Sequence, residues 1–418
     1  MQLSPPARER RGDLRGRAPV AAACCLLLII AAPARADVDV EAASHLTVFT
    51  EPSSRDSGVR VLHPQTEVTA TTGGFGIRAG YEMDAVSGST PRVYAPADAA
   101  GADAVTGATF SDTRHVAHGG LAFETATLAF QGNYSYGVES DYKSHTLSAA
   151  ARGDFAERNF SLSLAYTHSA DSVCDNPNTF TQDDIDRQPL ADSVGCFTAG
   201  GGKATRSVTI DTFSPSLSWT ATPLLMLTGG LSLQVLDGFQ SNPYRAVRLG
   251  SAGRTPQERL PENRQRYAVF AQATQAIPPV KSAVHLGARL YRDTWDLRAL
   301  SADAEWRSYF ASSLILSVRG RLHSQGSAVF YRSAEGLRLN GPVGQYWTGD
   351  RELAPFTTIM AGGGLTFVKT PPTEGSSFYE EIELDARFDM LVYRPEAGAP
   401  NADRKTAQVI QAGARIRF

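Results

Sequence analysis

Hydrophobic and polar residues alternate with a period of two along most of the chain. The clearest example is the segment 381–393, in which residues 382 to 392 of even number are apolar and residues 381 to 389 of odd number are charged. A β-strand places successive side chains on opposite faces, whereas a helix would distribute these residues around its axis. The pattern therefore predicts strands that each have one apolar and one polar face.

About sixteen segments of the chain show this pattern. They are 44–51, 58–71, 74–86, 111–124, 126–138, 141–154, 158–170, 205–219, 223–236, 264–277, 281–293, 296–308, 312–324, 354–368, 378–393 and 405–418. The segment 44–51 has the weakest pattern and is included because a barrel with both ends on one side needs an even number of strands. We expect sixteen strands, within a range of about 14 to 18.

Connections between these segments alternate between short turns and mostly long, polar loops. The long loops lie near 86–111, 171–204, 237–262, 325–353 and 394–404, and two tight members of the same class lie near Ser140 and Thr294. An up-and-down meander shows this alternation when short turns face the periplasm and long loops face outside. Because lipid offers no hydrogen-bond partner to a free sheet edge, the sheet must close. We predict an all-β, transmembrane, up-and-down antiparallel β-barrel; an exported soluble β-sandwich would also alternate, but it does not explain two classes of connection.

Residues 1–36 have the features of a cleaved signal peptide. An arginine-rich start precedes an apolar stretch that includes the residues 26–30, and Ala34-Arg35-Ala36 fits a cleavage site. The apolar stretch is shorter than the ~20 residues that a membrane-spanning helix needs. The barrel is therefore expected over residues 37–418.

The last predicted strand ends on an aromatic residue, Phe418. A terminal aromatic residue on an alternating strand is similar to the signal that the barrel assembly machinery of the outer membrane recognises. We therefore expect the protein in the outer membrane of a Gram-negative bacterium, where its partners are the membrane lipid and, during assembly, that machinery.

One short motif, Asp-Ala-Val-x-Gly-x-Thr, occurs twice inside a single connection. Its first copy contains Asp84 and Gly88, and its second copy contains Asp103 and Gly107. The carboxylates of Asp84, Asp103 and Asp112 are hard oxygen ligands of the kind that Ca²⁺ binds. The simpler interpretation is a pair of turns, because Asp and Ser/Thr bond their own backbone and Gly permits a positive φ.

The first copy of this motif, together with the preceding Gly80-Tyr81-Glu82-Met83, resembles a signature of the bacterial outer-membrane family called domain of unknown function 3570. The specific resemblance covers about residues 80–114, and the layout of the whole mature chain agrees with it. The resemblance implies a β-barrel in the outer membrane, and it implies no substrate.

Two cysteines lie outside the signal peptide, Cys174 and Cys196, and both fall in one polar loop. An exported protein meets oxidising conditions, so the pair is expected to form a disulfide. Two free thiols are the alternative.

If the apolar faces contact lipid, the polar faces of the strands line the lumen. The charged residues predicted there are Arg289, Asp303, Glu305, Arg307, Arg319, Arg321, Glu381, Glu383, Asp385, Arg387, Asp389, Arg415 and Arg417. These residues fit a polar pore whose charges select and orient solutes. They also fit a lumen filled by cross-strand ion pairs, although barrels of sixteen strands are usually wide enough for water.

Composition and motifs exclude several classes of function. The 418 residues are 42% hydrophobic and 20% charged, unlike a disordered chain, and a formal net charge of −3 leaves no basic surface for nucleic acid. We find no nucleophile elbow, zinc-protease motif or phosphate-binding loop, and so predict no enzyme, cofactor or metal site. The spacing of His115 and His118 places them on opposite faces of one strand, which argues against a shared site.

The sequence thus predicts an outer-membrane barrel that acts as a porin-like channel or a binder for small polar solutes. One alternative is a surface platform whose long loops bind a partner. A third hypothesis is a membrane-embedded hydrolase.

Overall fold

The computed structural model describes residues 38–51, 59–89, 109–176, 187–190, 196–197, 204–250, 256–333, 336–337, 340–342, 344–372, 378–395 and 405–418, and within these ranges it leaves out the side chains of 86–89, 109–112 and 405. The predicted signal peptide and the second copy of the motif, with Asp103 and Gly107, lie outside the described residues.

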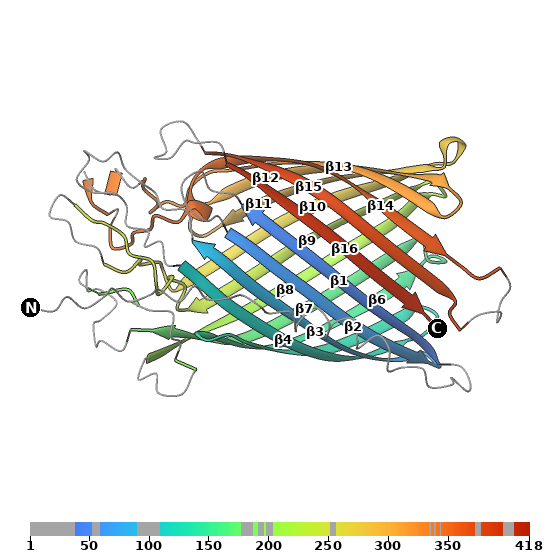
Figure 1. Ribbon diagram of the computed structural model, residues 1–418, viewed down its shortest axis with the longest axis horizontal. Helices are drawn as coiled ribbons and strands as arrows, with labels where there is room; N and C mark the ends of the chain where they lie inside the picture. The colour runs from blue at the N-terminus through green and yellow to red at the C-terminus, as the bar shows by residue number, and fades with distance from the viewer. Residues whose placement is uncertain are drawn as a thin grey trace, which may run out of the picture. The chain divides into compact units, whose positions relative to one another are not determined.

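Sixteen antiparallel strands make up the fold (Figure 1). They are β1 (Asp39–Glu51), β2 (Val59–Thr72), β3 (Phe75–Ser89), β4 (Thr109–Glu124), β5 (Leu128–Val138), β6 (Tyr142–Phe155), β7 (Phe160–Asp175), β8 (Ala204–Thr222), β9 (Leu225–Gly238), β10 (Asn263–Ile277), β11 (Ser282–Asp293), β12 (Arg298–Ala311), β13 (Leu314–Gln325), β14 (Phe356–Lys369), β15 (Glu381–Pro395) and β16 (Lys405–Arg417). Among the described residues, two short 3₁₀ turns, η2 (Pro278–Val280) and η3 (Arg351–Leu353), lie between strands. The predicted number of strands is confirmed.

Each strand pairs with its neighbours in the sequence, and β1 pairs with β16 to close the barrel. The closing register runs from Glu41 opposite Arg417 to Thr50 opposite Gln408. Closure leaves no sheet edge exposed to hydrocarbon, as a membrane-spanning sheet requires. The predicted up-and-down antiparallel barrel is therefore confirmed.

The two ends of the barrel differ in their connections (Figure 1). One end, which we call the short-turn rim, carries turns such as the two residues between β2 and β3 and also the C-terminus. In that turn Gly73 and Gly74 have φ values of +54° and +85°, the positive pair that a type I′ hairpin turn needs. The other end, the long-loop rim, carries the connections 239–262 and 326–355.

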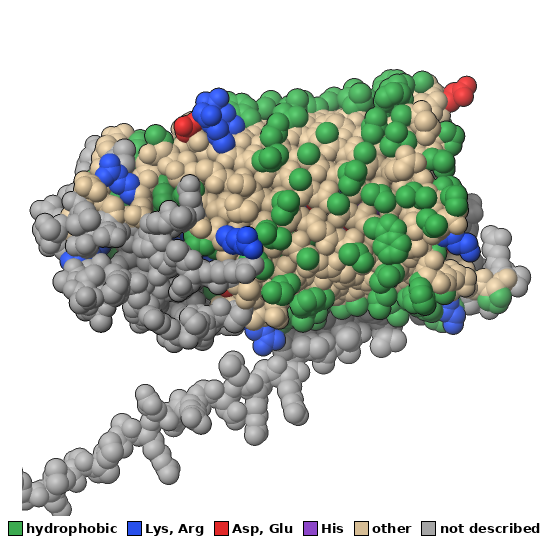
Figure 2. Space-filling model, turned by 90° about the horizontal axis from the view of Figure 1, so that it is seen from above, with side chains coloured by type: hydrophobic (Ala, Val, Ile, Leu, Met, Phe, Trp, Pro, Cys, Tyr) green, Lys and Arg blue, Asp and Glu red, His purple; other side chains and the backbone are tan. Residues whose placement is uncertain are grey.

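The outer face of the barrel is apolar. Leu121, Leu290 and Leu322 are 68%, 61% and 56% exposed. A continuous apolar surface of this kind would be unfavourable in water. Figure 2 shows hydrophobic side chains over one face of the wall, with Lys, Arg, Asp and Glu at its two ends. This belt is the lipid-facing surface of a membrane barrel. Within the described residues, no helix is long and apolar enough to cross a membrane.

The buried apolar core of the protein lies at the long-loop rim. One cluster joins Leu260 of the loop 239–262, Trp295 of the β11–β12 connection, and Phe330 and Leu353 of the loop 326–355. A second cluster joins Val247, Leu249, Leu337 and Trp347. The two long loops are therefore folded against each other across the end of the barrel.

Candidate functional site

The thirteen charged residues predicted to line the lumen alternate along their strands with exposed apolar residues. On β12 and β13, for example, Asp303 and Arg321 oppose each other, while the adjacent Leu322 faces outward. Alternation places the charged set on the inner face. These residues lie on β11, β12, β13, β15 and β16.

One of these residues, Arg319, binds a carboxylate two strands away. Its Nε lies 2.8 Å from Oδ1 of Asp389, and its Nη2 binds the second oxygen. Asp389 is only 2% exposed. Gly362 of β14 lies between them in register, so no side chain separates the two groups.

A second ion-pair cluster joins the last two strands to the first at the short-turn rim. Nη2 of Arg415 lies 2.7 Å from Glu383 and 3.7 Å from Glu381. Nη2 of Arg417 lies 3.2 Å from Glu41 of β1. These contacts connect the strands at which the barrel closes.

Three further pairs are looser or more local. Arg307 donates to Glu305 of the same strand at 2.6 Å, and Arg321 lies 3.8 Å from Asp303. His45 of β1 lies 4.0 Å from Asp385 of β15, across Gly413 of β16. Two of the thirteen, Arg289 and Arg387, have no ion pair with any described residue.

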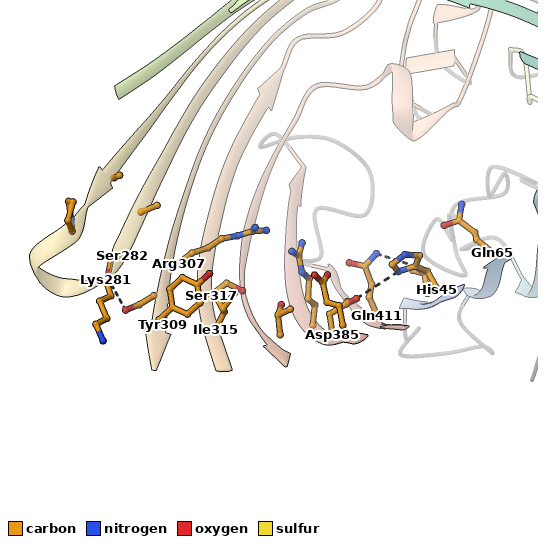
Figure 3. A pocket seen from close by; sticks show the side chains of 18 residues that line it. His45, Gln65, Lys281, Ser282, Arg307, Tyr309, Ile315, Ser317, Asp385 and Gln411 are labelled. Atoms are coloured by element: carbon orange, nitrogen blue, oxygen red, sulfur yellow. Dashed lines mark hydrogen bonds and ion pairs between the residues drawn. The ribbon is translucent and has the colours of Figure 1, made fainter. Parts of the chain in front are cut away.

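A cavity of about 950 Å³ occupies the short-turn half of the lumen. In Figure 3, Arg307 projects from one side of the open interior, and His45 and Asp385 meet at another side. Arg387 and Lys281 also line this inner cavity.

A second cavity of about 620 Å³ lies below the long-loop rim. Arg264 of β10 lines it but is neutralised, because its Nε donates to Asp293 at 2.9 Å and its guanidinium stacks 4.0 Å from the ring centroid of Trp295. Arg266 donates from Nη1 to Gln234 at 3.0 Å, and its buried Nε has no hydrogen-bond partner among the described residues. This outer cavity is also lined by Arg289, Tyr291, Ser301, His323 and, from the loop 326–355, Asp350, Glu352 and Leu353.

The η3 turn is held in the mouth of the barrel from two sides. Nη1 and Nη2 of Arg351 lie 2.7 and 2.9 Å from the Glu51 carboxylate at the end of β1. Nη1 of Arg245 lies 2.7 Å from Asp350 and 2.9 Å from Glu258. Burial works against the charge of Arg245, but Glu258 and Asp350 outweigh it and raise its pKa. Both arginines therefore remain charged and anchor the turn.

The disulfide between Cys174 and Cys196 is present, as the sequence predicted. The next residue, Asp175, is buried and binds Arg187, Arg206 and Gln257. Burial lowers the pKa of Arg187, and Asp175 opposes that shift. The end of β7 is thereby joined to the loop 239–262.

The first copy of the repeated motif lies within a strand. β3 continues to Ser89, where it still pairs with β4, so Asp84 and Gly88 do not form a turn. Asp84 accepts a 2.5 Å hydrogen bond from Nδ1 of His63 on the inner face. Among the described residues, no group of three or more His, Cys, Asp or Glu is arranged to hold a metal ion.

Asp84 belongs to a polar cluster that the sequence pattern did not predict. Nε2 of His118 lies 3.2 Å from Glu67 across Gly80, and its Nδ1 lies 3.7 Å from Glu82. The signal was weak because Pro64 and Thr66 interrupt the apolar face of β2. His115, by contrast, bonds Tyr81 at 2.6 Å on the outer face.

These features define an integral outer-membrane β-barrel protein of a Gram-negative bacterium. The chain belongs to the family described as "Protein of unknown function (DUF3570)", whose model matches residues 17–389. The family inferred from the motif at residues 80–114 is thereby confirmed. A comparison with curated proteins found no match.

Several solved structures are similar to the chain. A "Bacterial polysaccharide outer membrane secretin" is 9% identical, with 91% of this chain and 98% of that chain covered and a TM-score of 0.48. The outer membrane protein opdK from Pseudomonas aeruginosa is 10% identical, with 91% and 99% covered and a TM-score of 0.40. A BenF-like porin from Pseudomonas fluorescens Pf-5 is 9% identical, with 91% and 99% covered and a TM-score of 0.42.

Proposed function

We propose that the protein is a porin-like channel or binder for small polar solutes, with the long-loop rim outside the cell and the short-turn rim in the periplasm. The observation that carries this proposal is the pair of cavities inside one closed barrel, both lined by charged side chains. Exposed charges inside a barrel need water, and a hydrated lumen is a path for polar solutes. The η3 turn and the folded long loops narrow this path at its outer end.

Single-channel recording of the refolded protein, residues 37–418, in a planar bilayer tests the proposal. We expect stable conductance steps. A heat-modifiable, correctly folded barrel that gives no steps and binds no polar solute would overturn the proposal.

A surface platform is the second candidate function. It is supported by the two apolar clusters that fold the loops 239–262 and 326–355 into one surface. Replacing Trp347, whose Nε1 donates to Gln257, would disrupt this surface without touching the lumen wall. Loss of a cellular phenotype in a variant whose barrel still conducts would favour the platform.

A membrane-embedded hydrolase has weaker support. Nδ1 of His168 lies 2.8 Å from Asp211, which also accepts from Tyr166 at 2.6 Å on the outer face. This is a histidine–carboxylate pair, but no described Ser, Thr or Cys side chain bonds His168. Without a nucleophile on the histidine, the constellation for acyl transfer is incomplete.

A further inference from the structure

We infer that the lumen selects small organic carboxylates, which bind at Arg289 and Arg266 in the outer cavity and then at Arg387 in the inner cavity. This inference rests on the proposed function, because it names the class of solute for the same lumen.

The charges that line the two cavities are not balanced. Asp350 is paired with Arg245, and Glu383 with Arg415. Among the described residues that line either cavity, the carboxylates not paired with an arginine are Glu352 and Asp385, whose neighbour His45 at 4.0 Å is charged only when protonated. The cations without an ion pair are Arg266, Arg289, Arg387 and Lys281. The two cavities therefore carry an excess of positive charge that a solute can neutralise.

Among the described residues, the strands beside Arg266 and Arg289 supply no carboxylate that forms an ion pair with either arginine. β9 adjoins β10, and its single charged residue, Asp237, lies on the outward face. On the other side, Asp293 is occupied by Arg264 and Asp303 lies beside Arg321. Among the described residues of the wall, no carboxylate forms an ion pair with Arg289.

The surroundings of Arg289 suit a carboxylate in particular. Ser301 is its direct neighbour on β12, and His323 is the next residue in the same row on β13. The Ser301 hydroxyl lies 2.9 Å from Nδ1 of His323. The planar guanidinium of Arg289 offers several donors to one oxyanion. The rings of Tyr291 and Trp295 line the same cavity, where they can contact an apolar solute body.

Glu352 orients an anion that enters the outer cavity. It lies on η3 in the mouth and lines the same cavity as Arg266 and Arg289. Its negative charge sets the direction of the local field, so that an entering solute turns its carboxylate toward β10 and β11.

The first experiment measures the reversal potential across a bilayer with potassium benzoate at different concentrations on the two sides. Benzoate is the probe because aromatic rings line the outer cavity. We expect a permeability for benzoate above that for potassium. In Arg289→Gln combined with Arg387→Gln, we expect that ratio to fall about tenfold, the size expected for losing charge-assisted hydrogen bonds. Neither change strands a paired carboxylate, so the variant is expected to fold.

Two matched variants distinguish a specific carboxylate site from a general effect of positive charge. Arg298→Gln removes an arginine that pairs with Asp296 and is 66% exposed outside the lumen, and it should leave the ratio unchanged. Arg289→Lys keeps the charge but loses the planar fork, so anion selectivity should persist while benzoate binding weakens.

Benzoate binding is also measured by saturation-transfer NMR on the micelle-bound barrel, which requires no conduction. A silent barrel that binds benzoate through Arg289 would overturn the channel and leave the carboxylate site standing. A conducting barrel that prefers potassium, or one whose selectivity is unchanged in the double variant, would overturn the carboxylate site and leave the channel standing.

Discussion

Arg319 on β13 and Asp389 on β15 form an ion pair directly across β14, although their strands are not neighbours. Strands two apart are separated by about 9.6 Å, so a side chain on the middle strand would block such a contact. Gly362 occupies that position. The same arrangement recurs where Gly80 lies between His118 and Glu67. Inward-facing glycines therefore decide which charges of the lumen can meet.

Replacing Gly362 with Ala should break the Arg319–Asp389 pair. A Cβ at this position would overlap the Asp389 carboxylate and lie 2.5 Å from the Phe388 carbonyl oxygen. We expect the free energy of unfolding in urea to fall by about 1–3 kcal/mol, as for other overpacked sites. Gly320→Ala is the control, since its Cβ would have no neighbour closer than 3.6 Å. Equal stability of the two variants would contradict this explanation.

Removing only Arg319 should cost more than removing both partners. Arg319→Ala leaves Asp389 buried and charged without a partner, which destabilises by about 3 kcal/mol. Adding Asp389→Ala removes the stranded charge, so the double variant should recover part of the loss. Urea unfolding of the full double-mutant cycle measures the coupling, expected at about 1–3 kcal/mol. Additive losses would show that the two side chains do not interact.

Breaking the Arg351–Glu51 pair should release η3 from the barrel wall. The two hydrogen bonds measure 2.7 and 2.9 Å, and the Arg351 side chain is about half exposed. We therefore expect the loss of the pair to reduce the local stability of η3 by about 1 kcal/mol. Current noise in single-channel records should rise in Arg351→Gln and in Glu51→Gln alike, because both remove the same contact. An increase in only one variant would point instead to the changed charge of the mouth.

Tryptophans of the wall should contact lipid, and those of the loops should not. Trp219 and Trp306 are 43% and 39% exposed on the outer face, whereas Trp347 is 3% exposed in the loop core. In variants that keep one tryptophan each, brominated phospholipid should quench the fluorescence of Trp219 and Trp306 strongly. Trp347 serves as the internal control, and its quenching to the same extent would sink the assignment of the outer face.

The sequence predicted the barrel because a wall between lipid and a polar lumen must alternate apolar and polar side chains. The alternation of residues 381–393 needs only a period of two, and β15 follows it from Glu381 to Pro395. Strand ends were less predictable. β3 continues to Ser89 through a motif rich in turn-forming residues, because pairing with β4 extends beyond the segment marked by alternation.

The site was only partly predictable for a different physical reason. The alternation predicts that Arg289 and Arg319 both face the lumen. Whether each arginine finds a carboxylate partner depends on residues of the neighbouring strands. Arg319 reaches Asp389 because residue 362 is glycine, whereas the residue opposite Arg289 on β12 is Ser301 and not a carboxylate. The inward position of Asp350 and Glu352 depends on packing of the loop 326–355, which no local pattern encodes.

The pairing of β1 with β16 has a consequence for the order in which the protein acquires its structure. Residues 41–50 have their partners at 408–417, so the barrel cannot shut until nearly all of the chain has been added. Bringing such distant segments together carries a loop-closure cost that local hairpins do not have. Until then the growing sheet has two unsatisfied edges, and Arg417 has no Glu41 to bind. Stability in the bilayer is therefore gained in one late event. A chain that stops before β16 is left as an open sheet, whose unpaired edges make it unstable in lipid.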